Sequence, residues 1–121
     1  MAEIYDLDNY PPFAGPIRSL YIQLEERLLA LHPAARREYK KLYVAFKLDT
    51  NFVDVIPQHS KLILVFNLRF DQVDDPKGWC RDITNISRWG NGDVEMSLSE
   101  EAQIDYVMGI AEQVLALQVQ E

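Results

Sequence analysis

The sequence predicts an α+β domain in which a four-stranded, mainly antiparallel sheet carries the N- and C-terminal helices on one face. Two observations predict it. Residues 41–69 hold three short runs rich in Val, Leu, Ile, Phe and Tyr, separated by turn residues, which is typical of strands joined by hairpins. Apolar residues recur at helical spacing before and after this region. The predicted order is helix, three strands, short helix, strand, helix.

The chain has 121 residues, which is enough for one domain with a hydrophobic core and too few for two. We predict an N-terminal arm at 1–16, where three prolines exclude a continuous helix, followed by a single domain at 17–121. The aromatic residues Tyr5, Tyr10 and Phe13 either leave the arm free or attach it to the domain or to a partner. The sequence leaves both alternatives open.

The first helix is predicted at residues 17–31. Pro16 suits its start, where a missing N–H costs nothing, and Pro33 ends it, because the residue before a proline is pushed out of helical geometry. One stripe of apolar residues at helical spacing predicts a single buried face: Ile17, Leu20, Tyr21, Leu24, Leu28 and Leu31.

Three strands are predicted at 42–48, 52–56 and 62–69, and their short connections favour an antiparallel meander. The third strand is partly apolar on both sides, so both faces of the sheet need cover. We expect the two helices to cover the face that carries its Leu and Phe residues. We expect Trp79, Ile83 and Trp89 to cover part of the other.

The remaining elements follow from capping and turn residues. Asp75 and Pro76 are typical of a helix start and predict a short helix around 77–82. The tight turn at 89–93 contains Asn-Gly, and alternating residues predict a fourth strand at 94–98. Ser99 caps the last helix, whose apolar stripe faces the core.

Composition limits where the protein acts. No apolar run approaches the roughly 20 residues that a membrane-spanning helix needs, so we expect no membrane partner. The acidic N-terminus has no basic region of the kind that begins a signal peptide. Cys80 is the single cysteine, which fits a reducing compartment. We therefore predict a cytoplasmic protein.

Five pieces of sequence carry a resemblance to known proteins: YVAFK (43–47), NFVDVIPQ (51–58), LILVFNLRFDQVDDPKGWCRDITN (62–85), WGNGDVE (89–95) and DYVM (105–108). Together they resemble an uncharacterised bacterial domain family, over about residues 36–118. Its members occur alone, some labelled "predicted transport protein", or at the C-terminal end of proteins with restriction-endonuclease-like or related DNA-defence domains. The resemblance implies an accessory or recognition domain and supplies no catalytic residues.

No complete catalytic or metal-binding motif is present. A restriction-type nuclease needs an acid on one strand and acid-x-Lys on the next, to hold Mg²⁺ and orient water. One such triplet, Asp75-Pro76-Lys77, stands at a predicted helix start, so we interpret it as a cap. Two histidines and one cysteine lack ligand spacing, and the Gly-Asn-Gly turn lacks the lysine and helix of a phosphate loop. We expect no catalytic residue, metal or cofactor.

A polar group near the sheet is the candidate ligand site. We expect Lys47 and Arg69 on the outward faces of neighbouring strands, with the covering segment close by. Cations beside an amide and an indole would suit an anionic or planar ligand. The alternative, which we favour, is that Asp54, Asp82 and Asp93 neutralise these cations in structural ion pairs. The candidate residues are Lys47, Asn67, Arg69, Arg81, Trp89, Asn91 and Asp93.

Charge bears on nucleic-acid binding. The net charge of −7 repels phosphate backbones, but a local basic patch at Arg36, Arg37, Lys40 and Lys41 keeps this function among the alternatives. We predict a non-catalytic recognition domain, serving a nuclease or DNA-defence system, with a protein or nucleic-acid partner. The alternative is a domain that binds a small anionic or planar ligand on the same face. An enzyme ranks third, and homo-oligomerisation through a sheet edge or the arm stays open.

Overall fold

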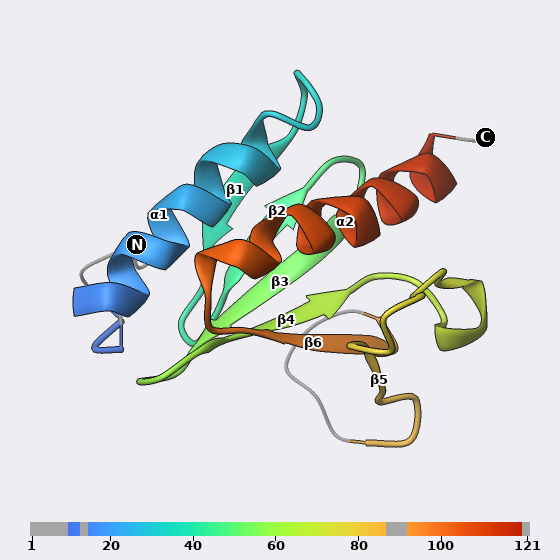
Figure 1. Cartoon of the computed structure of the whole chain (residues 1–121). Coiled ribbons are helices and arrows are strands. Elements are labelled where there is room, and N and C mark those ends of the chain that lie inside the picture. The colour runs from blue at the N-terminus through green and yellow to red at the C-terminus, as the bar shows by residue number, and fades with distance from the viewer. Residues whose placement is uncertain (1–9, 13–14, 87–91, 120–121) are drawn as a thin grey trace.

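A computed structural model describes residues 10–12, 15–86 and 92–119 and places both α-helices on one face of a single antiparallel sheet (Figure 1). The helices are α1 (Gly15–Leu29) and α2 (Ile104–Gln118), and a 3₁₀ turn (Glu101–Gln103) leads into α2. The strand order is β1-β2-β3-β4-β6-β5. The strands are β1 (Arg36–Tyr39), β2 (Val44–Lys47), β3 (Asn51–Pro57), β4 (Leu62–Phe66), β5 (Arg81–Asp82) and β6 (Val94–Leu98).

The α+β class and the common face of the two helices are confirmed, but the sheet has six strands and not four. The two missed strands lie at the edges. β1 pairs with β2, and its sequence RREY has no apolar alternation, because an edge strand can carry charges on both faces. β5 has only two residues, too few for any periodicity to show.

The prediction of a short helix around 77–82 is wrong. Arg81 and Asp82 instead pair with Glu95 and Val94 as β5. The Asp75 carboxylate accepts hydrogen bonds from the backbone N–H groups of Trp79 and Cys80, four and five residues on, so it closes a loop rather than capping a helix. Gly78 has a φ of 67°, which a right-handed helix does not allow.

Several element boundaries differ from the predicted ones. α1 begins and ends two residues earlier than predicted, and β2 and β4 are shorter. β4 ends at Phe66 because the Leu68 N–H turns back to the Phe66 carbonyl at 2.9 Å. β6 spans the predicted residues. Residues 77–86 therefore form loop and a short edge strand.

Part of the predicted arm is attached to the domain. Tyr10 is buried, and its hydroxyl donates hydrogen bonds to the main-chain carbonyls of Lys40 and Tyr43, the latter at 3.0 Å. Its ring lies 6.1 Å from the ring of Tyr39 on β1. Tyr5 and Phe13 lie outside the described residues. For Tyr10 the structure therefore shows attachment at the β1 edge.

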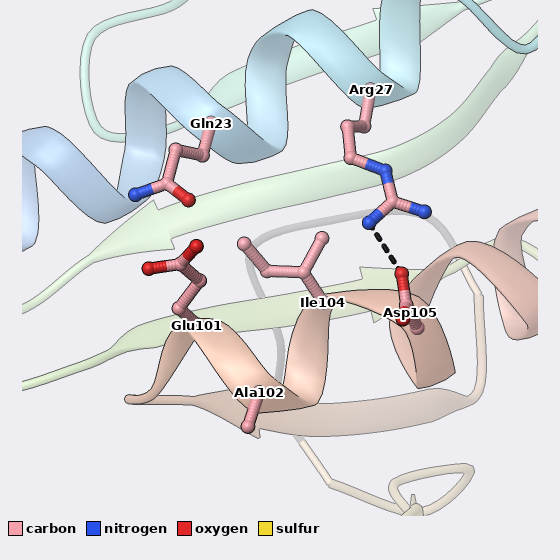
Figure 2. Close-up of a pocket in the computed structure, with 6 residues that line it drawn as sticks. All are labelled: Gln23, Arg27, Glu101, Ala102, Ile104 and Asp105. Carbon is pink, nitrogen blue, oxygen red and sulfur yellow. Dashed lines mark hydrogen bonds and ion pairs between the residues drawn. The ribbon is translucent and has the colours of Figure 1, made fainter.

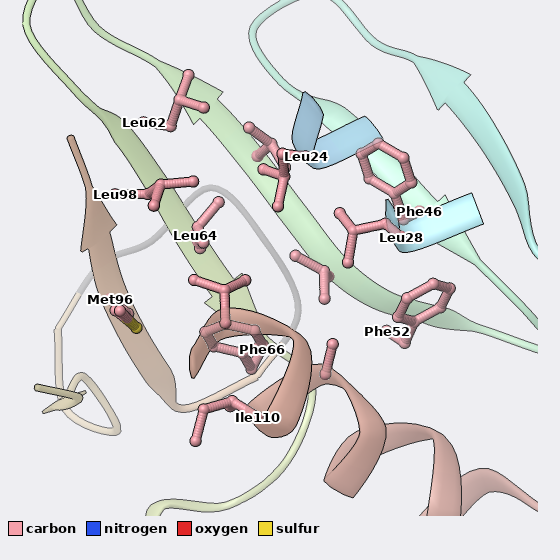
Figure 3. Packing of buried hydrophobic residues seen from close by; sticks show 14 of the residues in the cluster. Leu24, Leu28, Phe46, Phe52, Leu62, Leu64, Phe66, Met96, Leu98 and Ile110 are labelled. Atoms are coloured by element: carbon pink, nitrogen blue, oxygen red, sulfur yellow. The ribbon is translucent and has the colours of Figure 1, made fainter. Parts of the chain in front are cut away.

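The hydrophobic core lies between the helices and one face of the sheet. The strand registers align Phe46, Val53, Phe66 and Val94 in one row across four strands, all fully buried. The helices close this layer, and Figure 3 shows side chains from both packing over the strands. Burial on this scale contributes roughly 1.5–3 kcal/mol for each large apolar side chain.

The opposite face of the sheet has a different composition. Registers align a second row across all six strands: Glu38, Ala45, Asp54, Val65, Glu95 and Arg81. Asp54 is 0% exposed and accepts a hydrogen bond of 2.9 Å from the Asn51 side chain. Ile83, predicted to cover this face, is 1% exposed and directly follows β5, whereas Trp79 is 42% exposed. Trp89 lies outside the described residues.

Gly92 provides a test of how tightly the turn before β6 is packed. Its φ is 118°, and a Cβ built there would lie 2.0 Å from the Phe66 carbonyl oxygen. We expect Gly92→Ala to lower the free energy of unfolding by about 2–4 kcal/mol, because strain and overlap act together.

Gly109 is the matched control, because it lies exposed in α2 and an added Cβ meets nothing within 4 Å. We expect Gly109→Ala to raise the free energy of unfolding by about 0.5–1 kcal/mol, as alanine favours a helix interior. Urea unfolding of both variants is the measurement. Equal stability of Gly92→Ala and the parent chain would contradict the close packing.

Candidate functional site

The predicted ligand-binding residues are spread over several places in the structure. β3 lies between β2, which carries Lys47, and β4, so Lys47 and Arg69 are not on neighbouring strands. Asn67 and Arg69 follow the end of β4, and the Asn67 amide donates to the Asn51 carbonyl at 2.7 Å. Trp89 and Asn91 lie outside the described residues.

The three predicted cations each have a carboxylate nearby. Lys47 Nζ lies 3.1 Å from Glu38 Oε2, and Arg69 Nε lies 3.0 Å from Asp71 Oδ1. Arg81 Nη1 lies 3.9 Å from Glu95 Oε1. The Arg69–Asp71 pair is largely exposed, and Lys47 and Glu95 are the more buried members of the other two pairs. Exposed pairs contribute little to stability.

Arg69 and Asp93 do meet at one hollow of about 250 Å³ beside the end of β4. Its other lining residues include Asp71 and Asp82, so carboxylates outnumber cations there. The pKa of Asp82 is lowered by hydrogen bonds from the side chain and backbone of Thr84. This hollow suits an anion poorly. No group of three or more His, Cys, Asp or Glu side chains in the described ranges could hold a metal ion.

The predicted basic patch is divided between the two faces of β1. Arg37 is on the helix face, where it lies 3.0 Å from Glu25 of α1 and stacks 4.7 Å from the Tyr39 ring. Arg36 is on the opposite face and donates to the Leu48 carbonyl at 2.9 Å. Lys40 pairs with Glu38, and Lys41 lies exposed in the following turn. These four residues do not form one continuous basic surface.

A hollow of about 590 Å³ lies between α1 and the start of α2 (Figure 2). Arg27 of α1 bridges it to Asp105 of α2 at 2.5 Å, and both side chains are largely exposed. All of its charged lining residues are exposed, and none of its side chains is a histidine, cysteine, serine or lysine. Its six lining residues are Gln23, Arg27, Glu101, Ala102, Ile104 and Asp105.

The most organised polar cluster is the loop at residues 73–80, here called the Asp75 loop. The Asp75 carboxylate accepts hydrogen bonds from the N–H groups of Trp79 (3.2 Å) and Cys80 (2.8 Å) and from the Tyr106 hydroxyl on α2. The Gln113 side chain of α2 makes two hydrogen bonds to the backbone of Asp74, at 2.8 and 2.9 Å. The loop is therefore fixed to α2 by polar contacts at two points.

This loop holds Trp79 at the surface. The indole ring lies 4.8 Å from the ring of Tyr106, and Lys77 Nζ lies 4.5 Å from the centre of the indole. Trp79 nevertheless remains 42% exposed. An aromatic side chain that is both exposed and held in place is a common feature of binding surfaces, because little freedom is lost on binding.

Trp79 lines a hollow of about 340 Å³, here called the Trp79 hollow. Lys61 and Arg81 place two cations on its wall, and Gln103 adds an amide. The Gln103 side-chain oxygen accepts from the N–H groups of Ser99 and Glu100, and its NH₂ group takes no part in these contacts. The complete lining is Lys61, Trp79, Arg81, Glu95, Met96, Ser97 and Gln103.

Cys80 is not arranged as a nucleophile. Burial, followed by the nearby Asp75 carboxylate, raises the pKa of its thiol to about 12. The thiol is therefore protonated at neutral pH, and no histidine lies in this loop. The interpretation of Cys80 as a packed, unreactive thiol agrees with this geometry.

The comparisons with known proteins give the family. Residues 11–113 match the family described as "Domain of unknown function (DUF5655)", which is most of the chain. The chain belongs to this family. An uncharacterised protein of Haemophilus influenzae is 33% identical over 99 residues, which cover 82% of this chain and 33% of that protein. No solved structure matches.

The resemblance to an uncharacterised domain family is thus confirmed, and the chain spans about a third of the length of the curated relative. In the described part of the chain, no helix has the length and apolar character needed to cross a membrane. The association with nucleases and the transport label remain predictions, to which these similarities add nothing.

Sequence reasoning placed Arg81 in a binding site and Trp79 over the sheet, but it did not select Lys61, Ser97 or Gln103. One signal was present. Asp-Pro-Lys-Gly-Trp, at residues 75–79, combines a turn-forming Asp-Pro with a glycine directly before a tryptophan. Such a sequence favours a tight loop that exposes the indole ring. The prediction of a short helix at the same residues excluded this interpretation.

The stability of the contacts that hold the Asp75 loop should depend on pH. Burial opposes ionisation of Asp75, but hydrogen bonds from Tyr106, Cys80 and Trp79 outweigh it and lower the pKa below its ordinary value of 3.8. A carboxyl group whose pKa is lowered by folding stabilises the folded state at pH values above its pKa in the unfolded chain. This contribution is lost as the pH falls through the pKa of the folded state. We therefore expect the loop contacts to weaken below about pH 4.

Urea unfolding of the parent chain and of Asp75→Asn measures this effect. We expect the parent to be more stable at pH 7, by about 1 kcal/mol because the contacts are partly exposed, and the difference to shrink at pH 3. Tyr106→Phe, which removes one donor to this carboxylate, should show a smaller loss with the same pH trend. A difference that stays constant from pH 7 to pH 3 would contradict the role of the ionised carboxylate.

The raised pKa of Cys80 predicts slow alkylation. At pH 8, iodoacetamide should react with the folded protein at least about 10-fold more slowly than with the urea-unfolded chain, because the thiolate is scarce and half-buried. Mass spectrometry of the modified fraction against time measures the rate. Equal rates in the folded and unfolded chains would show that the thiol is exposed and ordinary.

Proposed function

We propose that this chain is a non-catalytic recognition domain that binds a protein partner at the Trp79 hollow. One observation supports this most directly: Trp79 is 42% exposed while the loop that carries it is hydrogen-bonded to α2 through Asp75 and Gln113. Tryptophan is prominent among residues that contribute most to binding energy, and arginine, here Arg81, is another. The loop is ordered before any partner binds.

A catalytic role has less support. Within the described ranges, the carboxylates near the Trp79 hollow already serve structural contacts, Asp75 to the loop and Glu95 to Arg81. The thiol of Cys80 is protonated at neutral pH. No group there combines a nucleophile with an adjacent base.

The setting proposed for this domain is an accessory part of a larger system. The Haemophilus relative is about three times as long as the matched segment, so the domain occurs beside other sequence in that protein. The resemblance described above suggests nuclease or DNA-defence proteins as the larger system. The single cysteine is consistent with a cytoplasmic site of action.

Nucleic acid and a small ligand are the alternatives. The net charge of −7 and the division of the β1 cations between two faces count against nucleic acid. A volume of about 340 Å³ and the cations Lys61 and Arg81 favour a small anionic or planar ligand as the second candidate. The hollow is lined by polar and charged groups along much of its wall, which is less typical of such pockets.

NMR titration of the ¹⁵N-labelled chain distinguishes these alternatives. The probes are a pool of random seven-residue peptides, a 12-nucleotide single-stranded DNA and adenosine monophosphate. We expect the peptide pool to shift the Trp79 indole signal and the amides of Arg81 and Ser97, and the other two probes to leave them unchanged.

Trp79→Ala should abolish the response, since the indole is the proposed anchor. Ile22→Ala is the control, because Ile22 is an exposed apolar residue on α1, away from the hollow. Shifts at the hollow with the mononucleotide alone would replace the leading proposal with the small-ligand alternative. No shift near Trp79 with any probe would overturn both.

A further inference from the structure

The sheet ends unevenly beside the Trp79 hollow. β6 runs from Val94 to Leu98, but β5 has two residues and pairs only with Val94 and Glu95. On that side the remaining part of β6, residues 96–98, has no partner strand among the residues that the structure describes. About 10 Å of strand edge therefore borders the hollow, at roughly 3.4 Å per residue.

The pairing pattern fixes which backbone groups face outward. The Ile83 N–H donates to the Asp93 carbonyl at 2.9 Å on the β5 side, and on β4 the Asn67 N–H donates to the Phe52 carbonyl of β3 at 3.1 Å. Hydrogen-bonding direction alternates along an antiparallel strand. When alternate residues are counted along the paired strands from either contact, the N–H and C=O of Ser97 face the side where β5 has ended. Ser97 therefore offers one backbone donor and one acceptor to the hollow.

The side chains around this edge would attract a negatively charged ligand. Lys61, directly before β4, and Arg81 on β5 carry cations on the wall of the hollow, and the Gln103 amide adds donor N–H groups. Among the described residues that line the hollow, Glu95 is the one carboxylate, and it lies 3.9 Å from Arg81. Trp79 supplies an apolar surface at the same place.

We propose that the hollow binds an extended acidic peptide segment as an added strand on β6, paired to the backbone of Ser97. Acidic side chains of the peptide contact Lys61 and Arg81, and an apolar or aromatic one packs on Trp79. Strand addition gains affinity from main-chain hydrogen bonds and specificity from alternate side chains. This inference rests on the proposed function and specifies its ligand and binding mode.

The other sheet edge is a poorer candidate. β1 carries Arg36, Arg37 and Glu38 at consecutive positions, and charges on an edge strand oppose pairing with another chain. A second copy of this chain at the β6 edge would bring two sets of Lys61 and Arg81 together, and like charges oppose such contact. Charge complementarity thus favours an acidic partner segment.

Selection from a displayed library of random seven-residue peptides on the full chain tests the proposal. We expect recovered sequences to be enriched in Asp and Glu and in β-branched residues. Each recovered peptide is then synthesised with one backbone N–H at a time replaced by N–CH₃. Methylation should weaken binding at least about 10-fold at one position, the N–H that donates to the Ser97 carbonyl, and not at the two neighbouring positions, because neighbouring N–H groups of an added strand point away from β6.

Two protein variants form a matched pair. Ser97→Pro removes the outward N–H, which is not needed for pairing with β4, and should weaken peptide binding by the same factor. Ser97→Ala keeps the N–H and should bind within about twofold of the parent. Both need a circular dichroism spectrum like that of the parent. Methylation of the peptide leaves the protein unchanged, so that scan decides the matter if Ser97→Pro does not fold.

Three outcomes would overturn the inference. These are the recovery of no binder, binders without acidic enrichment, and tight binding that N-methylation weakens at no position or equally at neighbouring positions. If peptides shift the Trp79 signals in the NMR titration but no single N–H proves sensitive to methylation, the strand mode fails while the recognition function stands. Dimerisation of the chain, detected by analytical ultracentrifugation and lost in Ser97→Pro, would assign the edge to a second copy and overturn the acidic-peptide proposal.

Discussion

The packing of two helices on one face of the sheet is the constraint on which the rest of the structure depends. The row that contains Phe46, Val53, Phe66 and Val94 is buried because α1 and α2 cover it. Both helices lie on that face of the sheet. The opposite face contains Ala45, Asp54 and Val65 at its centre and charged residues toward its edges. The burial of Asp54 requires that its hydrogen bonds be satisfied, and Asn51 supplies one of them. Exposed polar and aromatic side chains are therefore most accessible at the margin of the sheet, where β5 and β6 meet the Asp75 loop.

The Asp75 loop shows how a few polar contacts can organise a surface that the core does not reach. Asp75 bonds forward to Trp79 and Cys80 and across to Tyr106, so one carboxylate connects the loop, its indole and α2. The same carboxylate helps keep the Cys80 thiol protonated, although burial has the larger effect. Exposure of Trp79 and protection of Cys80 are thus two results of one arrangement. This is consistent with a surface built for recognition rather than for chemistry at the thiol.

The sequence predicts the fold better than the site, for physical reasons. Long apolar patterns predicted α1, α2 and the strands of the core, because burial selects side chains at regular spacing. β1 and β5 lie at sheet edges, where little is buried, so no pattern marked them. At Asp75-Pro76 the local signal for a helix lost to Gly78 and to hydrogen bonds with Tyr106, which is 31 residues away. The grouping of Lys61, Arg81, Ser97 and Gln103 depends on four separate segments, and no local signal reports such a meeting.

The hydrogen bonds of the Asp75 loop to α2 have a consequence for the dynamics of the domain. The loop is held mainly by polar contacts near water, whereas β2, β3 and β4 are held by buried apolar side chains. Segments held in the first way generally open at a lower free energy than the global unfolding reaction. The domain is therefore expected to have a stable interior and one margin that opens and closes independently of it. A partner that closes that margin would be opposed by only a small local ordering cost, and its binding would extend the protection of the interior outward to the edge of the sheet.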